Sequence, residues 1–227
     1  MLPIQQMITP YNYTAMVNKK NLYIVVHYIG AVSTAKNNAV YYCNTDLRGT
    51  DKEASAHYYV DEISIWQGVL DKDRAWHCGG GLQGTNGHTF YKKCTNSNSI
   101  GIEMCVKKTA DGKWYFEEET VKNTAELVKY LMDKHNIPIE RVIRHYDVTG
   151  KNCPAPYVNE SEWARFKDKV MKNSIEEYTD INDIVWELGH RGIVSDTSGM
   201  VAEMTQNPNG RLYWLARKAL QYMRERD

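Results

Sequence analysis

The spacing of apolar residues predicts several strands in the first three quarters of the chain. Residues 22–27 form a short, β-branched apolar run that ends in a histidine, which is typical of a buried central strand. Residues 57–60 and 63–69 are apolar runs on either side of an Asp-Glu pair, and they predict a hairpin with a polar turn. Residues 142–145 predict another short strand, which also ends in a histidine.

A further strand is predicted over residues 99–106, and its two faces differ in character. A period of two divides the side chains between the faces. One face carries Ile100, Ile102 and Met104. The other face carries Gly101, Glu103 and Cys105. Because glycine has no side chain, we expect the second face to stay open to a ligand beside Glu103.

Helical spacing alternates with these strands. Apolar residues recur at helical spacing over residues 120–135, and Asn136 and Pro138 predict the end of that helix. Ser161 is expected to cap a second helix, one face of which carries Trp163, Phe166 and Val170. Strands and helices that alternate in this way predict an α/β fold, with a mixed central β-sheet flanked by helices.

The chain changes character after residue 174. Three short amphipathic helices are predicted, over residues 181–188, from 197 or 198 to 204, and over 211–224. A segment of roughly 50 residues is marginal for an independent fold, so we expect docking on the larger domain or dimerisation. The sequence therefore predicts two domains: an α/β domain over residues 1–174 and a small all-α C-terminal domain over residues 175–227.

Composition narrows the class of protein. The 227 residues include 28 basic and 28 acidic side chains, so the formal net charge is zero. Nucleic-acid-binding proteins usually show a basic excess, so we expect no nucleic-acid partner. No apolar run approaches the roughly 20 residues of a membrane span, and the start has no charged segment followed by an apolar one. We therefore expect no membrane segment and synthesis in the cytoplasm without a signal peptide.

Three side chains that suit a metal ion lie at or after the ends of predicted strands. His27 ends the first strand, His145 ends a later one, and Cys153 lies in the loop that follows. Imidazole nitrogen and thiolate sulfur both suit zinc, and three protein ligands leave a position for water. The spacing alone also fits two core histidines and a buried thiol. Five cysteines without a C-x-x-C pair argue against a disulfide framework.

Four stretches of the sequence together resemble a known family. They are residues 24–27 (IVVH), 54–61 (ASAHYYVD), 98–103 (NSIGIE) and 144–154 (RHYDVTGKNCP). In this order they resemble the zinc-dependent N-acetylmuramoyl-L-alanine amidases related to peptidoglycan-recognition proteins, many of which are phage endolysins. The resemblance covers roughly residues 20–170 and implies the amidase type 2 fold of peptidoglycan-recognition proteins.

The resemblance also implies a site and a mechanism. One catalytic zinc ion would be held by His27, His145 and Cys153. Glu103 would take a proton from the attacking water and pass it to the leaving amine. Lys151 would stabilise the developing oxyanion. The alternatives by residue type are an exposed strand carboxylate paired with a lysine for Glu103, and a solvated loop residue for Lys151.

Two further positions complete the predicted site. Some family members place a catalytic tyrosine directly before the histidine that is His57 here; this chain has Ala56 instead, which shifts the acid–base role to Glu103 and favours a structural His57. Trp76 and His77 precede a run that contains three glycines, and similar residues lie beside the substrate groove in the family. We therefore expect Trp76 and His77 to bind substrate, with a glycine-rich surface turn as the alternative.

The resemblance implies an enzyme that hydrolyses the amide between N-acetylmuramic acid and L-alanine in bacterial peptidoglycan. As a phage or prophage endolysin, it would be released from the cytoplasm to lyse the cell wall. The C-terminal helices would target the wall or pair two copies as a homodimer. The alternatives are a non-catalytic peptidoglycan-recognition module and an amidase for small wall fragments inside the cell. Relatives expected to be inactive commonly lack the cysteine ligand, which this chain keeps as Cys153.

Overall fold

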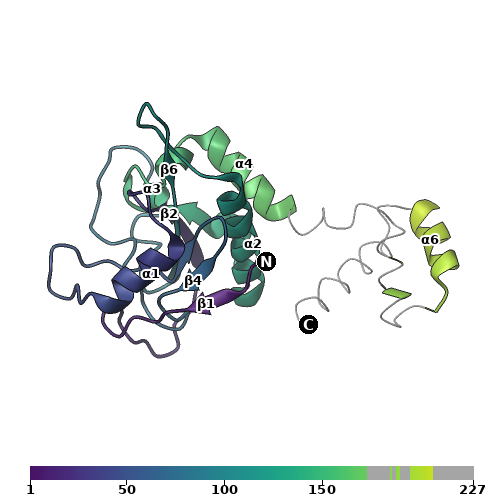
Figure 1. Ribbon diagram of the computed structural model, residues 1–227, viewed down its shortest axis with the longest axis horizontal. Helices are drawn as coiled ribbons and strands as arrows, with labels where there is room; N and C mark the ends of the chain where they lie inside the picture. The colour runs from purple at the N-terminus through teal and green to yellow at the C-terminus, as the bar shows by residue number, and fades with distance from the viewer. Residues whose placement is uncertain (173–184, 186–187, 190–194, 207–227) are drawn as a thin grey trace. The chain divides into compact units, whose positions relative to one another are not determined.

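The computed structural model describes residues 1–172, 185, 188, 189 and 195–206 (Figure 1). The chain divides into two compact units, Met1–Val170 and Met171–Asp227. In the second unit the described residues include helix α6 (Thr197–Gln206), where the sequence predicts a helix. The predicted helix over residues 211–224 lies outside the described residues, as do the predicted domain boundary and most of the predicted helix over residues 181–188.

The first unit is built on a six-stranded sheet. Its strands are β1 (Ile4–Gln6), β2 (Tyr23–Tyr28), β3 (Tyr58–Val60), β4 (Ile65–Gln67), β5 (Ser99–Met104) and β8 (Val142–Arg144). Their spatial order is β1-β4-β3-β5-β2-β8. Neighbouring strands are parallel except for β3 and β4, which form the predicted antiparallel hairpin. The mixed sheet expected from the sequence is therefore confirmed.

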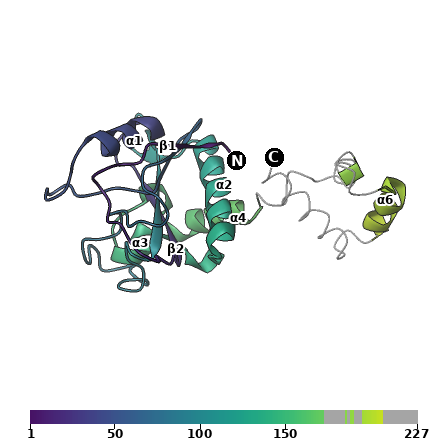
Figure 2. The same cartoon turned by 90° about the horizontal axis from the view of Figure 1, so that it is seen from below.

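Helices cover both faces of this sheet. They are α1 (Ala35–Asn44), α2 (Glu118–His135), α3 (His145–Thr149) and α4 (Glu160–Lys172), with 3₁₀ turns η1 (Ile139–Arg141) and η2 (Ala155–Tyr157). A small hairpin of β6 (Lys107–Lys108) and β7 (Trp114–Tyr115) follows β5. Helices α2 and α4 lie on one side of the sheet, and α1 and α3 lie on the other (Figures 1 and 2). No described helix is both long enough and apolar enough to span a membrane.

The side of the sheet beneath α2 and α4 forms the main hydrophobic core, which we call the apolar face. Its strand residues alternate along β2 and β5 as the period of two predicts, and they are Ile24, Val26, Ile100, Ile102 and Met104. The helices add side chains that include Leu127, Leu131, Trp163, Phe166 and Val170. Burying a large apolar side chain stabilises a fold by about 1.5–3 kcal/mol. This face therefore stabilises the sheet on which the other face is built.

The ends of the two core helices depend on asparagines. Helix α2 ends at Asn136, whose left-handed conformation (φ 54°) is one that asparagine tolerates, so the predicted end is confirmed. Helix α4 begins at Glu160, and the side chain of Asn159 accepts the N–H of Ser161 at 2.8 Å. The prediction that Ser161 caps this helix was therefore wrong, because Asn159 provides the accepting side-chain oxygen.

The opposite side of the sheet carries buried polar groups, and we call it the histidine face after His27, His57, His77 and His145. Helix α1, which covers part of it, was not predicted from the sequence. Only Ala35 and Ala39 of this helix are fully buried, so its apolar pattern is weak. Its start is set by Thr34, whose side chain accepts the N–H of Asn37 at 3.1 Å.

Candidate metal centre and active site

The parallel register of the sheet places predicted site residues side by side. His27 on β2 is in register with Glu103 on β5, and Glu103 is in register with Tyr59 on β3. Residues in register on adjacent strands project to the same side of a sheet. His145 directly follows β8, which is the other neighbour of β2. The backbone of His145 therefore lies next to that of His27. The register of the strands therefore places two candidate ligands, His27 and His145, beside the candidate acid Glu103 on the histidine face.

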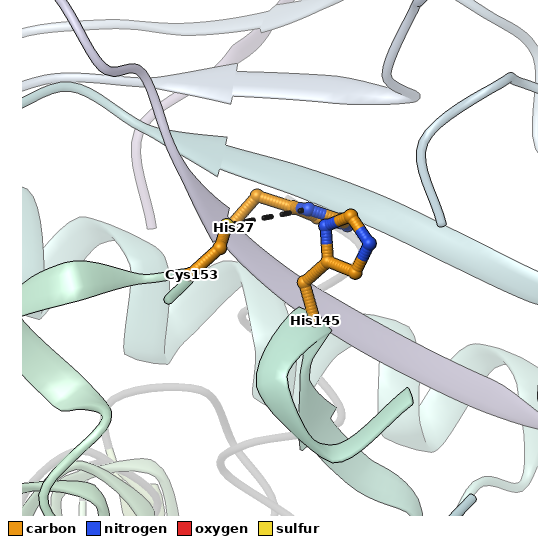
Figure 3. Close-up of side chains that lie close together, drawn as sticks. All are labelled: His27, His145 and Cys153. Carbon is orange, nitrogen blue, oxygen red and sulfur yellow. Dashed lines mark hydrogen bonds between the residues drawn. The ribbon is translucent and has the colours of Figure 1, made fainter. Parts of the chain in front are cut away.

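The three predicted metal ligands converge at this point. His27 comes from β2, His145 is the first residue of α3, and Cys153 lies in the loop after α3 (Figure 3). All three are buried, and their ligand atoms lie within 4.8 Å of one another. Sγ of Cys153 is 3.7 Å from Nδ1 of His27. The ring centroids of His27 and His145 are 4.7 Å apart. Two nitrogens and one sulfur at this spacing form a donor set that can hold a metal ion.

The two histidines are in the protonation state that binds a metal ion, whereas Cys153 would have to lose a proton. Nε2 of His145 is buried and has no hydrogen-bond partner among the described residues. Burial and the neighbouring His145 lower the pKa of His27 well below its usual value, and burial together with Lys151 lowers the pKa of His145 to about 3. Both imidazoles are therefore neutral, which is the form that binds metals. Burial raises the pKa of the Cys153 thiol to about 12, so metal binding would release its proton.

Glu103 is the carboxylate that lies in register with His27, one member of the cluster. Its Oε2 atom is enclosed and has no hydrogen-bond partner among the described residues. Burial raises the pKa of Glu103 to about 7, although Lys151 acts in the opposite direction. A carboxyl group with a pKa near neutrality can both accept and donate a proton at neutral pH. An exposed carboxylate paired with a lysine, the alternative from residue type, does not match this environment.

A cavity of about 360 Å³ opens beside the cluster. Its walls include His27, His145, Cys153, Glu103 and Lys151. The N–H of Cys153 donates to the carbonyl oxygen of Lys151 at 2.7 Å, and this tight turn brings both residues to the cavity. The volume falls in the range of small-ligand sites. The structure thus gathers the predicted ligands, acid and lysine around one cavity.

Trp76 and His77 also line this cavity, but they differ in their bonding. The indole N–H of Trp76 donates to Oγ1 of Thr14 at 3.1 Å. His77 is buried, and both of its ring nitrogens are engaged: Nδ1 lies 3.0 Å from Nε2 of His27, and Nε2 lies 3.1 Å from Oγ of Ser99. A substrate contact by Trp76 or His77 stays a prediction.

The space above Gly101 is filled by protein. A Cβ atom at this position would lie 2.5 Å from Cγ of His77. The N–H of Gly101 donates to Nδ1 of His57 at 2.9 Å. The expectation that Gly101 leaves its face open to a ligand was therefore wrong. The glycine is required because the imidazole of His77 packs directly against the strand.

Arg144 anchors the segment of α3 and the following loop that carries two of the ligands, a role that the sequence did not predict. Its guanidinium forms two hydrogen bonds to the carboxylate of Asp147, at 3.0 and 2.7 Å. It also donates to the carbonyl oxygens of Tyr157 and Val158, each at 3.0 Å, and pairs with Glu160. Planar two-point contacts of this kind fix geometry as well as charge. The Arg-x-x-Asp spacing was the only sequence signal for this anchor.

Tyrosines form a wall of the cavity that the sequence analysis also missed. Tyr28, Tyr42 and Tyr59 line it together with Ala56. The rings of Tyr42 and Tyr59 stack with centroids 5.5 Å apart, and the N–H of Ala56 donates to the hydroxyl oxygen of Tyr59 at 3.1 Å. Tyr42 comes from α1, the helix that was not predicted. Ala56 and Tyr59 belong to one hydrophobic cluster, against which Tyr42 packs.

The fold and the His-His-Cys cluster beside a carboxylate are those expected of a metal-dependent hydrolase. Residues 18–156 match the Amidase_2 family, described as N-acetylmuramoyl-L-alanine amidase, and the chain belongs to this family. The resemblance inferred from the four sequence stretches is thus confirmed.

Two curated relatives from Bacillus licheniformis are similar to the same region. N-acetylmuramoyl-L-alanine amidase CwlL is 36% identical over 149 residues, which are 65% of this chain and 40% of the relative. A probable N-acetylmuramoyl-L-alanine amidase is 34% identical over 148 residues, again 65% of this chain and 40% of the relative. The chain therefore spans about two fifths of the length of these relatives.

Solved structures with the same fold include endolysin catalytic domains. PlyL is 28% identical with a TM-score of 0.57, covering 74% of this chain and 97% of that structure. The catalytic domain of XlyA is 29% identical with a TM-score of 0.56, covering 74% of this chain and 99% of that structure. These matches confirm the expected fold class.

Proposed function

We propose that this protein hydrolyses the amide bond between N-acetylmuramic acid and L-alanine in bacterial peptidoglycan, and so lyses cell walls. The observation that carries the proposal is the meeting of His27, His145 and Cys153 beside Glu103, whose Oε2 atom has no hydrogen-bond partner among the described residues. Family membership supports the reaction, and the names of the similar curated proteins support the bond.

The donor set fits one zinc ion. Two nitrogens and one sulfur come from the neutral imidazole of His27, the thiol of Cys153 and His145, whose Nε2 has no partner in the described part of the chain. Three protein ligands suit catalytic zinc. When bound, zinc polarises a carbonyl and lowers the pKa of water. The three residues themselves are held in place by β2 and by the Arg144 anchor of the ligand loop.

Glu103 moves the proton in this proposal. Its carboxylate removes a proton from the attacking water and later donates that proton to the nitrogen of the leaving L-alanine. An amine is a poor leaving group without this proton, so the same residue serves both halves of the reaction. The pKa of about 7, raised by burial, suits a group that must exist in both forms near neutral pH.

Lys151 stabilises negative charge on the carbonyl oxygen of the substrate. It is exposed on the rim of the cavity, within electrostatic reach of Glu103 and both histidine ligands. A lysine acts here as a mobile point charge, without the fixed geometry of an arginine. Its contribution is therefore smaller than that of Glu103.

The polymer is proposed to lie across the cavity, with the tyrosine wall and Trp76 beside it. Aromatic rings that carry a polar group suit contact with sugars and peptides in a wet groove. The C-terminal unit is proposed to target the wall or to pair two copies. In the endolysin setting the enzyme acts on the wall after release from the cytoplasm.

The experiment is an assay of purified walls for new L-alanine amino termini, with reducing sugar ends measured in parallel. The expected result is release of amino groups without new reducing ends, loss of this activity on chelation, and recovery when zinc is restored. Walls from several bacteria control for the choice of substrate. Zinc binding together with binding to walls, but no amine release from any of them, would support the non-catalytic recognition module instead.

A further inference from the structure

Both ring nitrogens of His27 have a defined neighbour. Nδ1 faces the candidate metal centre, 3.7 Å from Sγ of Cys153. Nε2 lies 3.0 Å from Nδ1 of His77, on the other side of the ring. A neutral imidazole carries a proton on one nitrogen only. To bind a metal through Nδ1, His27 must therefore carry its proton on Nε2, and His77 must accept that proton in a hydrogen bond.

The tautomer of His77 follows from a short hydrogen bond that its neighbour Ser99 donates to Thr95. Oγ of Ser99 lies 2.6 Å from the carbonyl oxygen of Thr95, which can only accept, so the single hydroxyl proton of Ser99 points there. Oγ of Ser99 must then accept from Nε2 of His77, at 3.1 Å. With its proton on Nε2, His77 presents Nδ1 as an acceptor toward His27.

The surroundings of His77 hold its ring in this orientation. Oδ1 of Asn96 accepts the backbone N–H of His77 at 3.0 Å and that of Cys78 at 2.8 Å. The ring packs against the bare Cα of Gly101, where a Cβ would come within 2.5 Å of it. His77 is only 8% exposed, so a substrate reaches little of its side chain.

We propose that His77 and Ser99 are positioning residues that hold His27 in the tautomer whose Nδ1 is free to bind a metal ion. The hydrogen-bond chain, which we call the relay, runs from His27 through His77 and Ser99 to the carbonyl oxygen of Thr95. This inference rests on the proposed role of His27 as a metal ligand. It assigns His77 a role other than the substrate contact expected from the sequence, because both of its ring nitrogens are already bonded.

The relay has a measurable consequence for metal binding. If His77 instead donated through Nδ1, His27 would carry its proton on Nδ1, and that proton would occupy the ligand lone pair. Partners that orient a ligating histidine typically change metal affinity by about 10- to 100-fold. We expect loss of the relay to weaken zinc binding within that range.

The direct test is ¹⁵N NMR of the full-length, metal-free protein labelled at histidine, recorded at neutral pH. The expected result is that His27 and His77 both carry their proton on Nε2. A proton on Nδ1 of either residue would overturn the proposal. This measurement uses neither metal nor substrate, so its outcome is independent of whether the protein hydrolyses peptidoglycan.

Two substitutions of His77 separate hydrogen bonding from packing. His77→Asn keeps an amide oxygen near the position of Nδ1, whereas His77→Leu removes every acceptor. Zinc affinity is measured by competition with a chromophoric chelator. The expected loss for His77→Leu is about 10- to 100-fold, and His77→Asn should retain most of the affinity. Equal affinities in the two variants would contradict the relay, whether both fall or both stay at the wild-type value.

Ser99→Ala tests the far end of the relay without touching a ring. The expected result is a mixture of His77 tautomers and weaker zinc binding. The matched control is His57→Asn, because His57 is also buried and its ring lies 5.7 Å from that of His77, yet its partners are Gly101, Asp73 and Lys19 and not a ligand. His57→Asn should leave the His27 tautomer unchanged. Unchanged tautomers and zinc affinity in Ser99→Ala would contradict the proposal.

These outcomes are distinct from those that test the proposed function. A wild-type protein with the expected tautomers and tight zinc binding, but without amine release, would contradict the amidase proposal and support the relay. A fully active amidase with the His27 proton on Nδ1 in the metal-free state would support the amidase proposal and contradict the relay.

Discussion

The two faces of the central sheet are made from the same strands, yet they have different roles. On the apolar face, Ile24 and Val26 of β2 pack with the core beneath α2 and α4. On the histidine face, the next residue of the same strand is His27, in register with Glu103. One face therefore stabilises the fold by burying apolar surface, and the other uses that rigid support to hold polar groups in a buried site.

The difference teaches how buried polar groups are tolerated on the histidine face. His57 and His77 are bonded at both ring nitrogens, and the guanidinium of Arg144 is bonded to carboxylates and carbonyls. Nε2 of His145 and Oε2 of Glu103 are left without partners among the described residues. Buried polar atoms without partners are destabilising, and these two belong to residues that line the cavity, where a ligand could supply the missing partners.

The largest expected effect on the histidine face is kinetic. Glu103→Gln removes the proton acceptor but keeps the shape of the side chain, so kcat should fall by about 10²- to 10⁴-fold while zinc content stays at the wild-type level. Amine release from purified walls and metal content of the same samples would be measured together. An active Glu103→Gln variant would show that another group carries the proton.

The corresponding change on the apolar face affects stability. Phe166→Ala removes a fully buried ring packed against Trp163, and it should lower the free energy of unfolding by about 3–5 kcal/mol. Below its new unfolding temperature, the variant should bind zinc like the wild type. Chemical denaturation and chelator competition check the two halves of this statement. Weakened zinc binding in the folded variant would mean that the faces are not independent.

Glu103 also makes stability depend on pH in the metal-free protein. Burial raises its pKa from 4.5 to about 7, so the folded state binds the proton more tightly than the unfolded state does. Its contribution to stability is therefore present below about pH 4.5 and is lost as the pH rises through about 7. A shift of this size corresponds to about 3 kcal/mol.

The variant Glu103→Gln isolates this contribution. Its free energy of unfolding should match that of the wild type near pH 4.5. Above about pH 7 it should exceed the wild-type value by about 3 kcal/mol. Denaturation of both chelator-treated proteins across the pH range provides the comparison. Parallel pH profiles for the two proteins would show that Glu103 is not enclosed as described.

The smallest expected effect belongs to Lys151. Because this lysine is exposed at the cavity rim, Lys151→Met should lower kcat by about 10²-fold at most, with little change in stability. The matched control is Lys113→Met, which removes a lysine from the separate cavity beside β7. A loss as large as that of Glu103→Gln would contradict the smaller role given to Lys151.

The apolar face could be predicted well from the sequence, because its signal is local. The period of two along β5 and the helical spacing of Leu127 and Leu131 follow from short windows of residues. Helix α1 escaped prediction because only Ala35 and Ala39 are fully buried, so tertiary contacts and the Thr34 cap define it.

On the histidine face, residue types at strand ends pointed to His27, His145 and Cys153 as possible ligands, and the family resemblance then selected them. The pairing of His27 with Glu103 depends on parallel register between segments far apart in the chain, and no local pattern encodes it. The contact of His77 with Gly101 depends on the same long-range assembly. For this reason the ligand types were foreseen, whereas the ring that fills the space above Gly101 and the Arg144 anchor were not.

The central claim is that the histidine face forms a zinc-dependent amidase site, and the most direct test compares the wild type with Cys153→Ser. Bound zinc per chain and release of L-alanine amino termini from walls are measured on the same preparations, with circular dichroism to confirm folding. The account predicts about one zinc and amine release for the wild type, and loss of both in the folded variant. Amine release by a wild type without zinc, or undiminished release by Cys153→Ser, would contradict it.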